Sequence, residues 1–268
     1  MTDSDYLEIR KNIAANVDAI IDTERRYMTV LTDMVLKAAP QIVADFDRAI
    51  ELLPFWINYQ PRQRGRAYSG TSIPWSEVAE TAIGSNIIRA ISVSDLQVKF
   101  PGLPSGADIR FATHDALIHF DVKVAGPNDR ADEVVASPNQ VSGDGVSWNE
   151  GVMNSSVMVQ GQRAIMQFQP ELAPFYVLEG KVLLCLTYFL KGVYVVERLG
   201  YQPISYFELV CVPNGLLLFD GPLYANTPGL LIPGKDEKTF VKKRTRIRLA
   251  PLADIANWRR ALIWQRTP

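Results

Sequence analysis

Short apolar runs place the strongest constraint on how this chain can fold. They cover residues 181–190, 193–198 and 204–212, and they also dominate residues 96–124, where turns at 101–106 and 114–115 interrupt them. Turn formers such as Pro174, Gly192 and Pro203 separate or bound these β-branched and aromatic runs, a pattern typical of strands. The run over residues 182–190 is also far too short to cross a bilayer as a helix. We therefore expect these segments to be the buried strands of a sheet.

The N-terminal part of the chain has helical periodicity. Apolar side chains recur every three or four positions over residues 5–52, which predicts two or three helices with a break near Pro40. We favour a layer that packs on the core over a membrane or coiled-coil role. A further helix is expected after Thr71 or Ser72, either of which can cap it, with Pro74 in its first turn.

Helices that flank one mixed sheet make the chain α/β or α+β, and we take it as α/β with a central mixed β-sheet. With 268 residues and 47% hydrophobic content, it can bury a large core. We expect a single domain over residues 1–268, with an N-terminal helical layer at 1–52, a core at 54–249 and a C-terminal helix at 250–268.

The chain carries no sign of export or of a structural metal. Its first residues are acidic and polar, unlike a secretory signal, so we expect a cytoplasmic protein with no membrane partner. Cys185 and Cys211 both lie in apolar, strand-like segments without a CxxC motif. They are expected to be inert core thiols, and zinc is not expected.

Charge is unevenly distributed along the chain. The net charge of −1 argues against a nonspecific nucleic-acid coat, but a groove can be basic on an otherwise acidic protein. The densest basic segment is formed by Lys235, Lys238, Lys242, Lys243, Arg244, Arg246 and Arg248.

A carboxylate and an amine lie two residues apart within the apolar run at 117–124. Asp121 and Lys123 project from one face of a strand, and a hairpin would bring Asp108, thirteen positions upstream, close to Asp121. Carboxylates bind Mg²⁺, and an amine can orient water and stabilise charge during phosphodiester hydrolysis. Asp-x-Lys alone is a weak signal, because charges at strand ends are usually solvated. Its apolar context and the second acid favour a site.

Three further residues could support this chemistry. Glu77 and Glu80, one helical turn apart, are candidates for another acid beside the metal, although an exposed helix glutamate is the simpler interpretation of either one. His119 shares a face with Asp121 and Lys123. A supporting or merely polar role is the simpler interpretation for this histidine.

Residues 243–249 alternate between basic and apolar or small side chains. Arg244, Arg246 and Arg248 share one face, and a strand of this kind can enter a major groove, where guanidinium groups recognise guanine. The alternative is a solvated edge strand whose charges prevent aggregation. The candidate catalytic site at Asp121 and Lys123 favours the DNA-binding interpretation of this strand. Lys235 could add a base or phosphate contact.

Two loops could also face DNA. Residues 137–145 are rich in Ser, Asn, Gln and Gly, the composition of a turn, but Asn139 and Gln140 could hydrogen-bond bases. In the second loop, residues 54–70, Arg64 and Arg66 are candidates for phosphate contacts.

Five sequence blocks resemble those of the BglI-type restriction endonucleases, within the superfamily of Mg²⁺-dependent nucleases that carry the PD-(D/E)xK motif. They are PFWINY from Pro54; IPWSEVAE from Ile73; DVKVAGPND from Asp121, followed by SPNQVSGDG from Ser137; VPNGLLLF from Val212; and PGKD from Pro233 with KRTR from Lys243. The blocks extend over residues 54–249, so this part would be the catalytic and DNA-recognition core of a restriction-endonuclease-like fold.

The resemblance implies specific roles. Asp108, Asp121 and the Val122 carbonyl would hold the metal, Lys123 would be the catalytic amine, and Glu80 the accessory acid. Base edges in the major groove would be contacted by Asp129, Lys235, Glu237, Arg244 and Arg246. The sequence departs from the family at Glu237, where the family has aspartate, and at Ala107, which replaces a proline.

We therefore predict a Mg²⁺-dependent type II restriction endonuclease with one or two ions in each active site. It would act as a homodimer on double-stranded DNA at an interrupted palindrome, which by resemblance has GCC-like and GGC-like halves. A DNA methyltransferase of the same specificity would protect the host genome. The alternatives are a repair- or structure-directed nuclease of the same superfamily and a catalytically silent DNA-binding protein.

Overall fold

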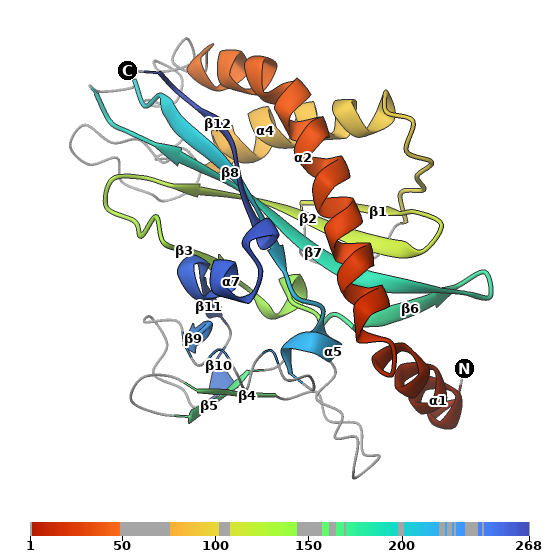
Figure 1. The fold of residues 1–268 in the computed structure, drawn as a ribbon. Helices are drawn as coiled ribbons and strands as arrows, with labels where there is room; N and C mark the ends of the chain where they lie inside the picture. The colour runs from red at the N-terminus through yellow and green to blue at the C-terminus, as the bar shows by residue number, and fades with distance from the viewer. Residues whose placement is uncertain are drawn as a thin grey trace, which may run out of the picture.

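A central mixed β-sheet organises the molecule (Figure 1). The computed structural model describes residues 2–48, 76–101, 108–143, 157–160, 165–168, 170–197, 201–219, 223, 227, 229–233, 241–242 and 244–267. The sheet contains β1 (Ile109–Ala112), β2 (Ala116–Ala125), β6 (Phe175–Leu178), β7 (Lys181–Tyr194), β8 (Ile204–Val212) and β12 (Arg260–Gln265). Its main path runs β1-β2-β7-β8-β12, and β6 also pairs with β7. Only β2 and β7 are parallel within this sheet, which confirms the mixed α/β architecture.

Two smaller sheets complete the described strands. The first has β11 (Thr245–Arg248) at its centre, between β3 (Glu133–Ala136) and β9 (Leu231–Pro233). The second joins β4 (Val157–Gln160), β5 (Ile165–Phe168) and β10 (Val241–Lys242). We call the β3-β11-β9 sheet the small sheet below.

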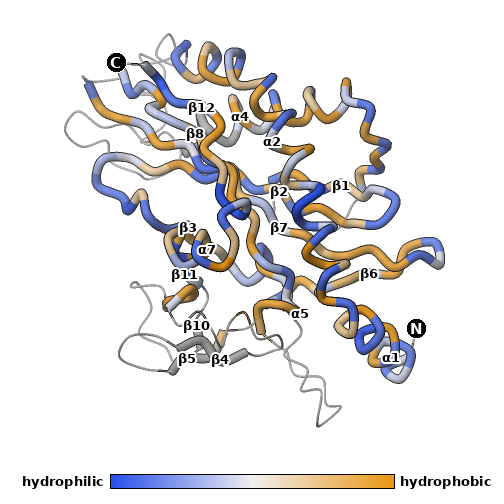
Figure 2. Tube along the Cα trace, viewed as in Figure 1, coloured by the Kyte–Doolittle hydropathy of each residue, from blue (hydrophilic) through white to orange (hydrophobic). Residues whose placement is uncertain are grey.

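The two faces of the central sheet are covered differently. Helices α2 (Val17–Arg48) and α4 (Ser76–Ser92) pack on one face, where Phe120, Tyr188 and Leu209 contribute to the larger core. The opposite face contributes Phe189 and Val210 to a second core, which also includes side chains of the small sheet, α5 (Gly215–Leu218) and α7 (Leu249–Ile255). Figure 2 shows the apolar character of the central strands. Alternate residues of β7 and β8 thus face two separate cores.

The N-terminal helices differ from the expected pattern at Pro40. Helix α1 (Asp3–Ala14) ends before Asn16, whereas α2 continues through Pro40 to Arg48. Proline removes one helical N–H, but the buried side chains of Val35, Ile42 and Phe46 hold both halves of α2 against the sheet. The predicted break near Pro40 is therefore wrong, and residues 49–52 lie outside the described residues.

Strand β7 also continues where a break was expected. Gly192 pairs with Val124 on one side and with Phe207 on the other. A Cβ atom at position 192 would lie 3.4 Å from the Phe207 ring, so the absence of a side chain suits close packing between strands. Strand β7 therefore contains the whole run at 181–190 but only the first two residues, Val193 and Tyr194, of the run at 193–198.

The C-terminal segment differs from the helix expected over residues 250–268. Helix α7 ends at Ile255, a short 3₁₀ turn follows at Asn257–Arg259, and β12 then pairs antiparallel with β8. Ile263 is buried while Leu262 is 60% exposed, an alternation that belongs to a strand. Pairing with β8 therefore decides the conformation of this segment.

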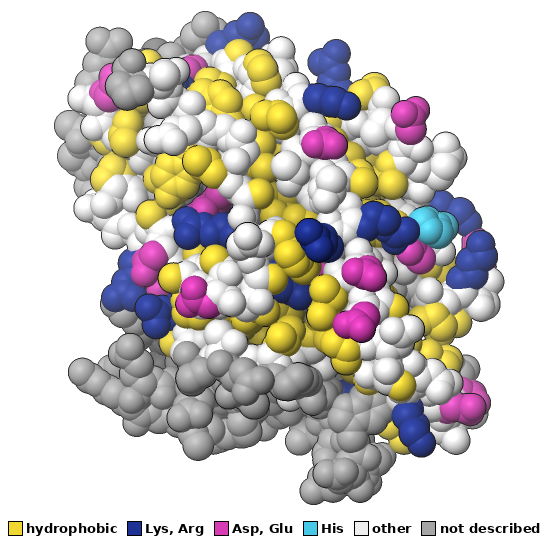
Figure 3. Space-filling view, viewed as in Figure 1, with side chains coloured by type: hydrophobic (Ala, Val, Ile, Leu, Met, Phe, Trp, Pro, Cys, Tyr) yellow, Lys and Arg dark blue, Asp and Glu magenta, His cyan; other side chains and the backbone are white. Residues whose placement is uncertain are grey.

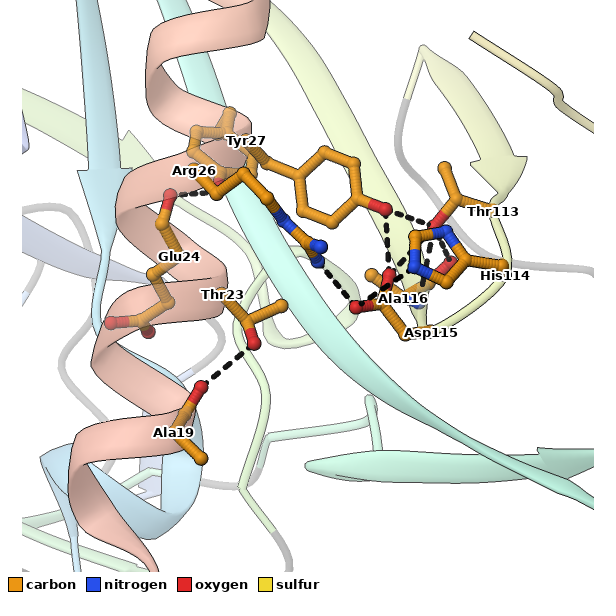
Figure 4. A network of polar contacts seen from close by, with 10 residues as sticks. Ala19, Thr23, Glu24, Arg26, Tyr27, Thr113, His114, Asp115 and Ala116 are labelled. Carbon is orange, nitrogen blue, oxygen red and sulfur yellow. Dashed lines mark hydrogen bonds and ion pairs between the residues drawn. The ribbon is translucent and has the colours of Figure 1, made fainter.

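Polar contacts fasten the β1–β2 hairpin to α2 (Figure 4). The hydroxyl of Tyr27 donates a hydrogen bond to Asp115 Oδ1 (2.7 Å) and also lies 2.6 Å from Thr113 Oγ1. Arg26 forms an ion pair with the same aspartate. Desolvation outweighs the lowering hydrogen bond from Thr113 and raises the pKa of Tyr27 to about 12. These contacts fix the hairpin that carries Asp108 and Asp121.

The described surface carries charges of both signs, and both cysteines lie in the core. On the face in Figure 3, basic and acidic side chains are interspersed among hydrophobic ones. Cys185 and Cys211 are buried free cysteines, and burial raises the pKa of both thiols, as expected of core residues. Within the described ranges, no helix has the length and apolar character needed to span a membrane.

Candidate active site

Asp121 and Lys123 lie together on β2, on the face that looks toward the small sheet and away from α2. Lys123 Nζ is 2.5 Å from Asp121 Oδ2, and it lies 5.7 Å from the centre of the Phe189 ring. The Asp121 side chain is 2% exposed and that of Lys123 is 28% exposed. The expected carboxylate–amine pair is thus formed, with its acid buried and its amine reaching toward solvent.

The β1–β2 hairpin brings Asp108 beside this pair. Ile109 lies opposite Phe120, so Asp108 is at the level of Asp121, and its Oδ2 accepts a 2.7 Å hydrogen bond from the Val122 N–H. Burial raises the pKa of Asp121 to about 6; the Lys123 ammonium opposes this shift, while the charge of Asp108 adds to it. The predicted proximity of the two acids is therefore confirmed.

Gln140 completes the contacts of the pair. It lies in the 3₁₀ turn Pro138–Gln140, is 7% exposed, and donates from Nε2 to Asp121 Oδ1 (2.7 Å). Its Oε1 accepts from Lys123 Nζ at 3.3 Å. The structure therefore puts the Gln140 amide against the catalytic candidates, and its expected contact with DNA stays a prediction.

Three other candidate residues belong to α4 and β2. The side chains of Glu77 and Glu80 lie outside the described residues, but their helix α4 packs against β2. His119 is buried on β2, and burial lowers its pKa to about 4, with the charge of Arg110 acting in the same direction. This histidine is accordingly neutral near pH 7, which agrees with a supporting role.

The donor set suits a hard divalent cation. Asp108 is exposed and Asp121 lies next to it. Within the described residues, Asp121 Oδ2 accepts no hydrogen bond apart from its contact with Lys123. The described residues contain no cluster of three His, Cys, Asp or Glu side chains that could hold a metal, so two carboxylates are the acidic donors available here. Oxygen ligands of this kind fit Mg²⁺.

The alternating basic segment forms the central strand of the small sheet. Thr245 and Ile247 are buried, while Arg246 and Arg248 are partly exposed, so the predicted alternation is confirmed. Because β11 pairs on both sides, with β3 and β9, the alternative of a solvated edge strand is wrong.

The recognition candidates in and near this sheet differ in exposure. Arg244 is exposed, whereas Arg246 is 16% exposed and forms an ion pair with Glu133 of β3, whose side chain is 2% exposed. Asp129 is exposed, and its Oδ2 accepts a 2.9 Å hydrogen bond from the Gly126 N–H within a turn that follows β2. Asn139 is partly buried. Lys235, Glu237, Arg64 and Arg66 lie outside the described residues.

Two residues at this end of the sheet, Glu133 and Lys191, are not among the residues predicted from the sequence. Glu133 contacts Arg246 and also Arg130 (3.4 Å). The ammonium of Lys191, which is 2% exposed, donates to the backbone oxygens of Ala131 (2.5 Å) and Glu133 (2.7 Å). A lysine inside the apolar run of β7 was the available signal, because a buried lysine needs partners.

Comparison with known proteins gives a consistent result. The family model of restriction endonuclease BglI matches residues 2–263. The type II restriction enzyme BglI of Bacillus subtilis is 35% identical over 255 aligned residues, which cover 85% of each protein.

Solved structures agree with this match. The crystal structure of the restriction endonuclease BglI bound to its DNA recognition sequence superposes with a TM-score of 0.84 at 31% identity, over 96% of this chain and 94% of that chain. The tetrameric restriction endonuclease SfiI bound to cognate DNA gives a TM-score of 0.67 over 94% and 86% of the two chains. At 10% identity, the second likeness concerns the fold alone.

Proposed function

Because the chain belongs to the BglI family of restriction endonucleases and is a type II restriction endonuclease, we propose that Asp108, Asp121 and Lys123 form its catalytic site. The observation that carries this proposal is the convergence of two acids and one amine at the end of the β1–β2 hairpin. The phosphodiester bonds of double-stranded DNA are the substrate.

Asp108 and Asp121 would hold a divalent cation, which we propose is Mg²⁺, as one or two ions. When bound, the ion supplies Lewis-acid stabilisation of charge on the phosphate and a water of lowered pKa. Val122 offers a third oxygen. Its N–H points to Asp108, and the N–H and C=O of one strand residue face the same neighbouring strand, so its carbonyl is on the Asp108 side of β2.

Lys123 would orient the attacking water and stabilise the charge that develops on the phosphate. Its partial exposure, with the ammonium on the Asp121 carboxylate, supports this role, because the amine is anchored and can still meet a substrate from solvent. Asp121 must be ionised to act as a ligand. Its pKa of about 6 leaves it mostly charged at pH 7 and above. Glu80, from α4, is proposed as the accessory acid.

Recognition would involve the small sheet and the turn after β2. We propose that Arg244 and Arg246 of the basic segment read base edges in the major groove, together with Asp129, Lys235 and Glu237. Asn139, Arg64 and Arg66 are proposed for further contacts with DNA. The exposed positions of Arg244 and Asp129 support the assignment of these two.

The proposed target is an interrupted palindrome with GCC-like and GGC-like halves. A homodimer would match its two-fold symmetry, so that each subunit cuts one strand. In the cell, a DNA methyltransferase of the same specificity would protect the host sites from cleavage.

Cleavage of plasmid DNA with and without Mg²⁺ tests the catalytic assignment. Wild-type protein should give discrete fragments with Mg²⁺ only, whereas diffuse nicking or a preference for branched substrates would indicate a repair nuclease. Lys123→Ala should abolish cutting while the affinity for DNA in Ca²⁺ survives. Full activity of this variant would overturn the catalytic assignment.

A further inference from the structure

We propose that Gln140 is a positioning residue that holds the Asp121 carboxylate and the Lys123 ammonium in their working arrangement. This inference rests on the catalytic roles proposed above for Asp121 and Lys123. It concerns one side chain that touches both groups and comes from a separate part of the chain.

Three hydrogen bonds determine the orientation of the Gln140 side-chain amide. Oε1 accepts from the Ser137 N–H (3.0 Å) and from Lys123 Nζ (3.3 Å), both of which can only donate. Nε2 donates to Asp121 Oδ1 (2.7 Å), which as a carboxylate can only accept. A flipped amide would face two donors with its NH₂ group and a carboxylate with its oxygen. Only one orientation satisfies all three partners.

Hydrogen bonds hold the backbone of the turn that carries Gln140. The 3₁₀ turn has a capping box, in which Ser137 and Gln140 exchange side-chain and backbone hydrogen bonds. The Glu171 N–H donates to Pro138 O at 2.8 Å. Because the turn is fixed by its neighbours, the amide meets Asp121 without a large ordering cost on substrate binding.

The same segment is clamped just after Gln140. The Gly143 N–H donates to Leu172 O (2.8 Å), and the Gly215 N–H donates to Ser142 Oγ (2.9 Å). A Cβ atom at Gly215 would lie 2.5 Å from Ser142 O and 2.6 Å from Gly143 Cα. Only glycine fits at 215, so backbone contact between α5 and the turn supports the position of Gln140.

The consequence is that Gln140 occupies Asp121 Oδ1, which directs the other oxygen, Oδ2, toward Lys123. Hydrogen bonds to a ligating carboxylate orient it, and loss of such a partner typically lowers metal affinity or activity by about 10- to 100-fold. Gln140 therefore sets the orientation of the acid and the location of the amine together.

The variant Gln140→Met tests the proposal, because methionine keeps an unbranched chain of similar length but makes none of these three hydrogen bonds. We expect Mn²⁺ affinity, measured by calorimetry on the protein without DNA, to fall about 10- to 100-fold. The Mg²⁺ concentration for half-maximal single-turnover cleavage should rise by a similar factor. DNA affinity without metal should stay within about threefold of wild type, since the phosphate contacts are unaltered.

Tyr188→Phe is the matched control. It removes the buried hydrogen bond from the Tyr188 hydroxyl to Glu24 O (2.7 Å) and the contact of this hydroxyl with the Cys211 thiol, on the α2 face of the sheet. We expect it to lower the Tm without changing either metal dependence. An equal change in Mn²⁺ affinity in both variants would mean that the effect reports on stability and would overturn the role of Gln140.

Two further outcomes distinguish a failure of the positioning role of Gln140 from a failure of the proposed catalytic site. If Lys123→Ala is inactive and Gln140→Met binds Mn²⁺ and cuts like wild type, the positioning role is wrong while the catalytic assignment stands. If Lys123→Ala cuts normally, the assignment itself fails. Should Gln140→Met not fold, Gln140→Asn decides by the same measurements, because its amide is one methylene too short to reach Ser137 and Asp121 together.

Discussion

Glu24 and Arg259 form an ion pair in the core although 235 positions separate them in the chain. Arg259 Nη2 lies 2.6 Å from Glu24 Oε2, and the two side chains are 1% and 0% exposed. Glu24 Oε1 accepts from the Asn214 N–H at 2.6 Å. The pair thus joins α2 to the 3₁₀ turn before β12, and it also holds the start of α5.

Breaking this pair should destabilise the fold strongly. Arg259→Met leaves the Glu24 carboxylate buried without its cation, and such losses cost about 3 to 5 kcal/mol. Glu24→Gln keeps an acceptor for the Asn214 N–H but leaves the buried Arg259 guanidinium without its carboxylate. The double variant should lose less free energy of unfolding than the sum of the single variants, because neither charge remains unpaired. Urea denaturation of all four proteins measures this coupling, and strict additivity would contradict it.

The pH dependence of stability should contain two opposing contributions from β2. The folded-state pKa of Asp121 is raised by burial to about 6, so its contribution favours folding below about pH 4 and is lost as the pH rises to 6. The pKa of His119 is lowered by burial to about 4, so its contribution is present above about pH 6.5 and is lost as the pH falls to 4. Each of these two pKa shifts corresponds to about 3 kcal/mol in the free energy of unfolding.

Single variants should separate these contributions in metal-free buffer. In His119→Gln, the free energy of unfolding should decrease from pH 4 to pH 6 relative to wild type, because only the Asp121 contribution remains. In Asp121→Asn it should increase over the same interval. Urea denaturation at half-unit pH steps provides the measurement, and parallel pH profiles for the three proteins would refute both assignments.

The sequence predicted that the proposed catalytic residues lie together, because their geometry is local. Strand periodicity put Asp121 and Lys123 on one face, and a short hairpin was enough to bring Asp108 near them. The position of Gln140 was not predictable in this way. Its turn is held by Leu172 and Gly215, which lie about 30 and 75 positions further along the chain, so its direction depends on tertiary contacts.

The same distinction explains the C-terminal error. Apolar residues over 251–265 are spaced as in a helix, but residues 260–265 pair with β8 across some 50 positions. Backbone hydrogen bonding at a sheet edge overrides a weak local preference. Conversely, α2 was recognised as helical because its buried stripe is long, and the one proline within it does not outweigh that packing.

Lys191 should hold the segment between β2 and β3 in place. Lys191→Met keeps the aliphatic chain but removes the donor to Ala131 O and Glu133 O. The contact with Glu133 O is buried, so its loss should cost about 1 to 3 kcal/mol. We expect faster amide hydrogen exchange over residues 129–136 and a lower Tm. Lys181→Met is the control, because Lys181 lies exposed on the same strand. Unchanged exchange in the Lys191 variant would show that other contacts suffice.

Arg244 and Arg246 should respond differently to truncation, although both are proposed to read DNA. Arg244 is exposed, so Arg244→Ala should reduce discrimination against altered sites by about 1 to 3 kcal/mol without a change in Tm. Arg246→Ala also removes the nearer of the two arginines that contact the buried Glu133 carboxylate, the other being Arg130 at 3.4 Å. It should therefore lower the Tm as well as the discrimination.

The combined variant Arg246→Ala/Glu133→Gln distinguishes the two effects of Arg246. Neutralising Glu133 should recover much of the Tm, because no buried carboxylate then lacks its nearer cation. Base discrimination should stay low, since the Arg246 guanidinium is still absent. Cleavage rates on cognate and singly altered sites, measured beside thermal unfolding, provide both readouts. If discrimination returns together with the Tm, Arg246 supports the small sheet and does not read bases. If it stays low at a recovered Tm, the guanidinium itself contributes to recognition.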